Sequence, residues 1–477
     1  MRNSSWLTLS SFTAVSRVLG LIRDVICAQV FGASAEFDAF IVAFQIPNFM
    51  RRLFAEGAMA QAFVPLYAGL NPKQQKTFAG MALTMISCCT FAVVVLAWFA
   101  GKGLICLYAP GFAKAGQLSK AINMLHWTMP YITAISIVTI CSGINNSHNK
   151  FALTGAITIV LNLILILAAL ISHQNIIYLA YGVFFSGIIQ VIIMLICTWN
   201  LIGPCRLDFN NSELRRLVNL MGLGALAAVV GQLGVMLDTF LASWLSVGSV
   251  SAIYFAQRLV FLPIGIVAVA VATALTPTLA KLKLDHDKFK AKLSWGGKLV
   301  WQVSWPACFG LIVMAPLVVK LVFEHGAFDS NASILTSNII MAMSLGLPAF
   351  MLNKVLLSAL YAQKQAKRAV NIMLKCLIFN FLLGLVLMYS CKQIGIVLAT
   401  VLSAWLQFFL LAKDLQMNFL RFLEPCSSVF MALVLLCLTK IIKGVSLPVH
   451  IAILLVTGII IYELCLRLNK QSLVKSL

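Results

Sequence analysis

Hydrophobic residues occur along this chain in long runs that charged residues seldom interrupt. Two runs near the start, Trp6–Phe31 and Phe37–Tyr67, contain arginines. Twelve further runs cover residues 81–100, 121–144, 152–171, 176–199, 219–245, 259–280, 299–323, 334–360, 371–390, 394–412, 427–442 and 449–466. Each is near the roughly 20 residues that a helix needs to cross a bilayer. The pattern predicts an all-α integral membrane protein with about fourteen transmembrane helices.

The composition agrees with a membrane protein. Of the 477 residues, 61% are hydrophobic and only 10% are charged, and the mean hydropathy is +0.98. Soluble domains carry far more charge. Thirteen cysteines are scattered through the runs without a CxxC pair, so they are interpreted as small apolar residues.

The net charge of +21 could indicate nucleic-acid binding, but the placement of the basic residues argues against it. Lysine and arginine recur in every second connection: Lys73 and Lys76, Lys150, Arg206 to Arg216, Lys281 to Lys292, Lys364 to Arg368, Lys413 and Arg421, and Arg467 to Lys475. By the positive-inside rule these connections are cytoplasmic. We therefore expect a multi-pass membrane protein with both termini cytoplasmic and no nucleic-acid partner.

The arginines inside apolar runs are the strongest indication of function. A cation within a bilayer costs several kcal/mol, so Arg17, Arg23 and Arg51 should face a protein interior or a wet cavity. Arg258 should lie roughly 10–15 Å from the outer end of its own helix, which is also near mid-depth. Arginine binds phosphate through a planar fork that donates two hydrogen bonds, so the expected cargo is an anion such as a pyrophosphate.

Other interpretations of these charges remain open. Arg17 and Asp24 lie seven residues apart on one helix face, so an internal ion pair competes with ligand binding. Arg52 and Glu56 have i,i+4 spacing and would pair with each other, which leaves Arg51 as the better ligand. Pro47 should kink or unwind the second span.

A weak internal repeat indicates two lobes. Asp24 matches Asp238 at an offset of about 214 residues, and Asn162 matches Asn380 at a similar offset. Because the repeated unit holds an even number of spans, the copies are parallel. We expect an N-terminal lobe at 1–205 (spans one to six), a C-terminal lobe at 206–420 (spans seven to twelve) around a central cavity, and two appended spans at 421–477.

Three motifs in the first two spans carry a family resemblance. They are Ser16-Arg17-Val18-Leu19-Gly20 with Arg23-Asp24, Asp38-Ala39-Phe40, and Pro47-Asn48-Phe49-Met50-Arg51-Arg52-Leu53-Phe54-Ala55-Glu56-Gly57-Ala58. The chain closely resembles the MurJ (MviN) lipid II flippases, which belong to a superfamily with multidrug and polysaccharide exporters. The resemblance implies a transporter that flips undecaprenyl-pyrophosphate-linked peptidoglycan precursor from the inner to the outer leaflet by alternating access. Its partners would be lipid II, membrane lipids and, in addition, peptidoglycan synthesis proteins.

The resemblance also implies a set of site residues. The family's cavity arginines match Arg17, Arg23, Arg51 and Arg258, and the neighbouring Ser16, Asp24 and Asp38 are counted with the substrate-binding set. Gln45 and Gln257 depart from the family, many members of which have Lys and Asp there.

A sodium site is a further expectation from the resemblance. Some members bind sodium, and Asp238, Asn380 and Thr400 match the ligands, while Gly384 stands where a second acid occurs. The alternative for Asp238 is a structural hydrogen bond. No other cofactor is expected.

The rival function is export of drugs or other lipid-linked oligosaccharides on the same fold. An enzyme is disfavoured, because the chain lacks a Walker loop and paired carboxylates at the membrane face.

The expected topology is testable with single cysteines in a variant that lacks the native cysteines. A cysteine near Lys150 or Lys367 should be shielded from an impermeant thiol reagent added outside the cell, whereas one near Gly248 or Asp329 should react. Labelling of the Lys367 position from outside would contradict the span count or its orientation.

Overall fold

The computed structural model describes residues 2–54, 58–208, 211–417, 426–442 and 445–475, and all of its regular structure there is helical. The chain divides into two compact units. One unit extends to Ser251 and includes Gly326–Phe328; the other holds Ala252–His325 and the residues from Asp329 onward.

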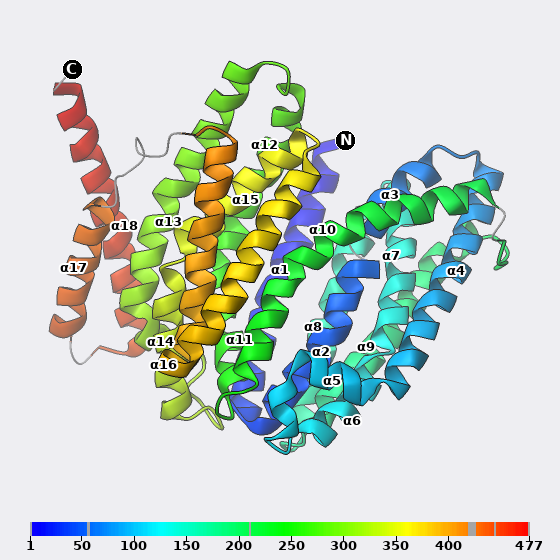
Figure 1. Ribbon diagram of the computed structural model, residues 1–477, viewed down its shortest axis with the longest axis horizontal. Coiled ribbons are helices and arrows are strands. Elements are labelled where there is room, and N and C mark those ends of the chain that lie inside the picture. The colour runs from blue at the N-terminus through cyan, green and yellow to red at the C-terminus, as the bar shows by residue number, and fades with distance from the viewer. Residues whose placement is uncertain (1, 55–57, 209–210, 418–425, 443–444, 476–477) are drawn as a thin grey trace. The chain divides into compact units, whose positions relative to one another are not determined.

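The first unit contains ten helices in its described residues (Figure 1). They are α1 (Arg2–Phe31), α2 (Ala35–Phe54), α3 (Ala58–Ala68), α4 (Pro72–Phe99), α5 (Gly101–Tyr108), α6 (Leu118–Thr128), α7 (Tyr131–Ser147), α8 (Phe151–Ile171), α9 (Ile177–Thr198) and α10 (Ser212–Ala242). Helix α1 packs along α8, α7 packs on both α4 and α9, and α10 packs on α2 and α3.

The second unit begins within α11 (Ser249–Pro263). Its other helices are α12 (Val269–Lys281), α13 (His286–Val322), α14 (Ser330–Ser344), α15 (Leu347–Ala362), α16 (Ala366–Asp414), α17 (Cys426–Ile441) and α18 (Leu447–Lys475). Helices α17 and α18 pack on each other and on α13, where Met314, Met431 and Leu454 form part of a buried cluster.

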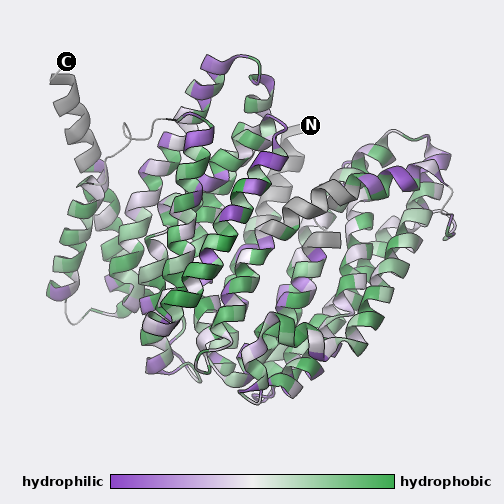
Figure 2. Ribbon diagram, viewed as in Figure 1, coloured by the Kyte–Doolittle hydropathy of each residue, from purple (hydrophilic) through white to green (hydrophobic). Residues whose placement is uncertain are grey.

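Helices lie along every apolar run of the sequence, and four of the runs, at Phe37–Tyr67, 121–144, 259–280 and 334–360, are divided between two or more helices. Hydrophobic residues extend along the middle of the helices and hydrophilic residues gather at many of their ends (Figure 2). By length and composition, eight helices of the described residues can cross a membrane, or nine when the bent pair α14 and α15 counts as one span. Helices α1 and α2 are not in this count because their arginines and acidic residues make them too highly charged for it.

Two expected helices appear as one in this count. Helix α16 is 49 residues long, but Lys392 has non-helical dihedral angles (φ 48°, ψ −126°), so the backbone turns there. The two arms match the predicted runs 371–390 and 394–412. A Cβ atom at Gly395 would lie 2.2 Å from the carbonyl oxygen of Leu387, so only glycine fits beside this turn.

Side chains in the connections cap several helices. The Asn211 side chain accepts hydrogen bonds from the backbone N–H groups of Glu213 and Leu214 at the start of α10. Asp285 accepts one from Lys288 N at 3.1 Å at the start of α13. The hydrogen bond from the Lys288 side chain also lowers the pKa of Asp285 below its usual value. Both side chains therefore cap the first turns of their helices.

The structure narrows one local expectation, that Pro47 kinks or unwinds the second span. Helix α2 continues from Ala35 to Phe54 with Pro47 inside it, so the second span is not unwound at the proline. The predicted Arg52–Glu56 pair and the Arg421–Pro425 loop lie outside the residues whose side chains or backbone are described.

Candidate functional site

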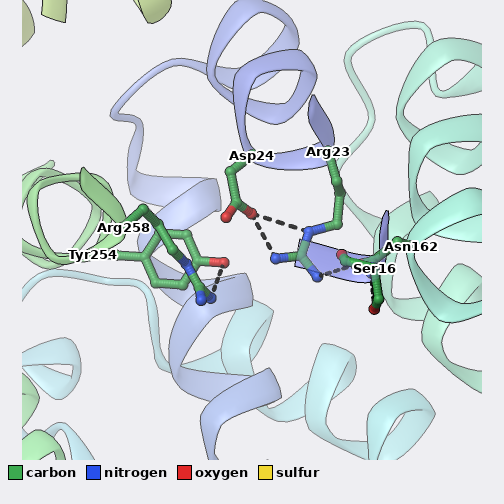
Figure 3. A network of polar contacts seen from close by, with 6 residues as sticks. All are labelled: Ser16, Arg23, Asp24, Asn162, Tyr254 and Arg258. Carbon is green, nitrogen blue, oxygen red and sulfur yellow. Dashed lines mark hydrogen bonds and ion pairs between the residues drawn. The ribbon is translucent and has the colours of Figure 1, made fainter. Parts of the chain in front are cut away.

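A polar network joins α1 to α8 inside the first unit (Figure 3). Arg23 donates from Nε and Nη2 to Asp24 Oδ1, at 3.0 and 2.6 Å. Its Nη1 donates to Asn162 Oδ1 at 3.1 Å, and Asn162 Nδ2 donates to the backbone oxygen of Ser16, also at 3.1 Å. One guanidinium thus connects an acid on its own helix to an amide on the neighbouring helix.

Burial makes this network energetically important. Arg23 is 8% exposed and Asp24 is 2% exposed. A charge in such a place is tolerated only when it is paired and hydrogen-bonded, and removal of one partner of a buried pair costs about 3–5 kcal/mol. The ion pair considered from the sequence was Arg17–Asp24, whereas the structure shows Asp24 paired with Arg23 at 2.6 Å.

Arg17 has a different environment on the same helix. Six residues separate it from Arg23, so the two side chains leave α1 about 120° apart. Arg17 is exposed, whereas Arg23 is buried, and Ser16 is half-buried beside the Asn162 amide. The two arginines that the sequence grouped together thus face different surroundings.

On α2, Arg51 is half-buried and Gln45 has a clear partner. Thr239 Oγ1 on α10 donates to Gln45 Oε1 at 2.9 Å. The glutamine at this family departure therefore connects two helices through a neutral hydrogen bond. A lysine there could not accept this bond.

Asp38 is 2% exposed and lies at the other end of α2. It accepts hydrogen bonds from Gly248 N at 2.7 Å, from Ser251 N at 2.7 Å and from Ser251 Oγ at 2.5 Å. Gly248 has φ +84°, and a Cβ there would lie 2.6 Å from the Ala33 carbonyl oxygen. The carboxylate thus holds the chain segment that begins α11 against the start of α2.

Arg258 is exposed on α11 and contacts a tyrosine one turn earlier. Its Nη2 donates to Tyr254 Oη at 2.7 Å, and its guanidinium carbon lies 4.4 Å from the centre of the Tyr254 ring (Figure 3). The contact combines a hydrogen bond with a cation–π interaction. It orients the guanidinium plane while the residue stays accessible.

The predicted sodium ligands are distributed over both units. Asp238 is buried on α10 in the first unit. Asn380 and Thr400 lie on the two arms of α16 in the second, and Thr400 Oγ1 donates to Asn380 Oδ1 at 3.4 Å. Among the described residues, no group of three or more His, Cys, Asp or Glu side chains could hold a metal ion.

No role was predicted from the sequence for Asn162 or for the Ser251 hydroxyl. Asn162 did carry a signal, because it matches Asn380 in the internal repeat. Ser251 and Gly248 carried none, since their contact with Asp38 depends on a turn that joins positions more than 200 residues apart.

Comparison with known proteins defines first the class and then the family. The fold resembles an inward-facing multidrug resistance MATE family transporter of the MOP superfamily, with a TM-score of 0.67 over 86% of this chain and 98% of that one at 12% identity. At this identity the likeness shows the fold alone, and with the eight or nine candidate spans of the described residues it is the fold of a multi-pass helical membrane protein.

A second structure is more similar: a lipid II flippase MurJ in an inward closed conformation, with a TM-score of 0.86 and 26% identity over 98% of this chain and 100% of that one. The probable lipid II flippase MurJ of Buchnera aphidicola subsp. Acyrthosiphon pisum is 31% identical over 460 residues, which is 93% of this chain and 89% of the relative. The profile "Lipid II flippase MurJ" matches residues 27–463. The chain belongs to the lipid II flippase MurJ family, whose members reside in the bacterial inner membrane.

The α1–α8 network makes a stability prediction. Asn162→Ala removes an acceptor from a buried cation and should lower the free energy of unfolding by about 1.5–3 kcal/mol, measured as a lower melting temperature in detergent. Asn162→Asp keeps an acceptor for Arg23 and should lose less. Asn331→Ala, at an exposed asparagine of α14, is the control and should melt like the wild type. Equal melting of Asn162→Ala and the control would show that the network contributes nothing.

Proposed function

We propose that this lipid II flippase moves undecaprenyl-pyrophosphate-linked muropeptide from the inner to the outer leaflet by alternating access. The observation that carries the proposal is the set of cations on helices that cover apolar runs. Arg17 and Arg258 are exposed, so their side chains are accessible to an anionic ligand, whereas Arg51 is half-buried and its Nε is buried. A pyrophosphate suits them, because each planar fork can donate two hydrogen bonds to phosphate oxygens.

In this proposal the remaining residues of the predicted site do not bind the substrate but position the helices that carry Arg17 and Arg258. Arg23, Asp24 and Ser16 hold α1 on α8 through Asn162, which orients the helix that carries Arg17. Asp38 holds the start of α11, the helix that carries Arg258. The substrate-binding set is thus supported by a layer of buried polar contacts.

The proposal keeps the organisation expected from the sequence. It has fourteen spans, with a lobe at 1–205, a parallel lobe at 206–420 around a central cavity, and two appended spans at 421–477. Both termini are cytoplasmic, as the basic connections indicate. The lobes follow the sequence repeat, whereas the two compact units follow contacts, which is why α10 belongs to the second lobe and to the first unit.

Sodium coupling is the least direct element of the proposal. Hard cations prefer oxygen ligands, and Asn380 and Thr400 bring two neutral oxygens together. Asp238 would supply the negative charge, since it has Leu237 where the first lobe has Arg23. A bound sodium ion would offset the desolvation of that carboxylate and favour one conformation through its differential affinity.

Loss of the accessible arginines should stop transport. Arg17→Ala and Arg258→Ala each remove a charge-assisted contact to phosphate worth about 1.5–3 kcal/mol, and should abolish movement of labelled lipid II across reconstituted vesicles. Lysine at either position should restore only part of the activity, because the planar fork is lost.

Two controls make this assay decisive. Arg216→Ala, at an exposed arginine of α10, should transport normally. An unrelated lipid-linked sugar should not be moved; efficient transport of that sugar would favour the broader exporter. Full activity of both alanine variants in cells depleted of other flippases would contradict the proposed site.

Asp238→Asn separates coupling from binding. The variant should bind lipid II normally but lose part of the dependence of transport on a sodium or proton gradient, because the charge that attracts the cation is gone. Transport is measured in vesicles while each gradient is collapsed in turn. An unchanged response to both would assign Asp238 a structural role.

A further inference from the structure

Three lysines lie in a connection that the proposed topology places on the outer side of the membrane, opposite the cytoplasm. Lys102 is in the first turn of α5, Lys114 lies in the turn after Pro110–Ala113, and Lys120 is in the first turn of α6. Basic residues are biased toward cytoplasmic connections, so lysines on the opposite side require a local explanation.

Two of these lysines have partners within the first unit. Lys120 Nζ lies 2.6 Å from Glu36 Oε1. Lys114 Nζ lies 4.9 Å from the centre of the Trp244 ring. Lys102 is exposed, and within the described part of the chain no ion pair or ring contact engages it. Its charge therefore remains accessible to a ligand.

An apolar groove includes Phe99, which precedes Lys102 by three residues in the chain. Helices α4, α7 and α9 lie side by side (Figure 1), and their outer surfaces enclose a groove of about 620 Å³. Its walls include Phe91 and Phe99 on α4, Ala134 on α7, and Ile188 on α9. No charged side chain lines it, and its volume is in the range of roughly 300–1,000 Å³ typical of ligand pockets.

The groove has the depth of one leaflet. Phe91 to Phe99 extends about 12 Å along α4 at 1.5 Å per residue, close to half of the roughly 30 Å hydrocarbon core. At one end Trp98 lines the groove and stacks on His126, with ring centres 4.4 Å apart. Tryptophan favours the membrane interface, so this end lies at the level of the headgroups. Lys102 follows four residues later.

We propose that this groove and Lys102 form a binding site for an anionic phospholipid of the outer leaflet. One acyl chain occupies the groove, and the phosphate lies at the Lys102 ammonium. The assignment to the outer leaflet rests on the topology of the proposed function. The site is separate from the substrate arginines, which lie on α1, α2 and α11.

Native mass spectrometry of the full-length protein, titrated with phosphatidylglycerol or phosphatidylcholine, tests this site. Phosphatidylglycerol should bind the wild type more tightly, and Lys102→Gln should weaken its binding roughly tenfold or more, as expected for loss of a charged hydrogen bond. Ala134→Phe fills the groove and should remove one bound lipid of either kind. Lys73→Gln and Ile196→Phe, at exposed positions outside the groove, should bind like the wild type.

Several results would overturn the proposal. If Lys102→Gln binds phosphatidylglycerol as tightly as the wild type, the phosphate does not lie at Lys102. If a groove-filled variant binds the same number of lipids as the wild type, the groove does not hold an acyl chain. If Ala134→Phe does not fold, as judged by gel filtration, Val95→Trp fills the groove from its open side and replaces it. Displacement of phosphatidylglycerol by undecaprenyl phosphate would assign the groove to the substrate's tail instead. Lipid II transport by Lys102→Gln is measured in parallel, so a failure here is distinct from a failure of the proposed flippase function.

Discussion

Neutralisation of buried charge is the constraint on which the first unit depends. A guanidinium or carboxylate that leaves water must find a counter-charge or several donors, and α1 and α2 use both solutions. Asp24 is neutralised by Arg23, whereas Asp38 relies on three donors from Gly248 and Ser251. Both networks also join segments that are distant in the sequence, because Arg23 contacts Asn162 and Asp38 contacts Gly248 and Ser251. The polar groups therefore do more than avoid a desolvation penalty, because they determine which surface of α1 faces α8 and where α11 begins.

Hydropathy was enough to locate helical segments, since helices lie along every apolar run, including the two arms of α16 on either side of Lys392. It did not predict the breaks within runs, such as the bend between α14 and α15. The spacing of residues along the sequence was not enough to predict the contacts within the site. The seven-residue spacing of Arg17 and Asp24 left an ion pair between them open as an alternative to ligand binding. It did not indicate that the long Arg23 side chain folds back to its neighbour Asp24. Asn162 could not be assigned from sequence because its contact depends on the packing of two whole helices.

The two repeats place one acid in two different environments. In the first, the guanidinium of Arg23 lies beside Asp24 and connects it to Asn162. In the second, Leu237 precedes Asp238, while Asn380, the repeat partner of Asn162, accepts from the neutral hydroxyl of Thr400. A permanently attached cation gives the first arrangement a fixed charge balance.

The order of Arg23 and Asp24 in the chain has a consequence for biosynthesis. Asn162 follows Arg23 by 139 residues. At roughly 5–20 residues per second, a ribosome needs on the order of ten seconds to make this stretch. During that interval α1 must enter the bilayer without α8, and an unpaired arginine at the helix centre costs about 2.5–3.5 kcal/mol on insertion scales. Asp24 emerges immediately after Arg23, so the ion pair can form before either neighbouring helix exists. The acid thus acts as a built-in insertion partner, and the amide of α8 joins a charge that is already neutral.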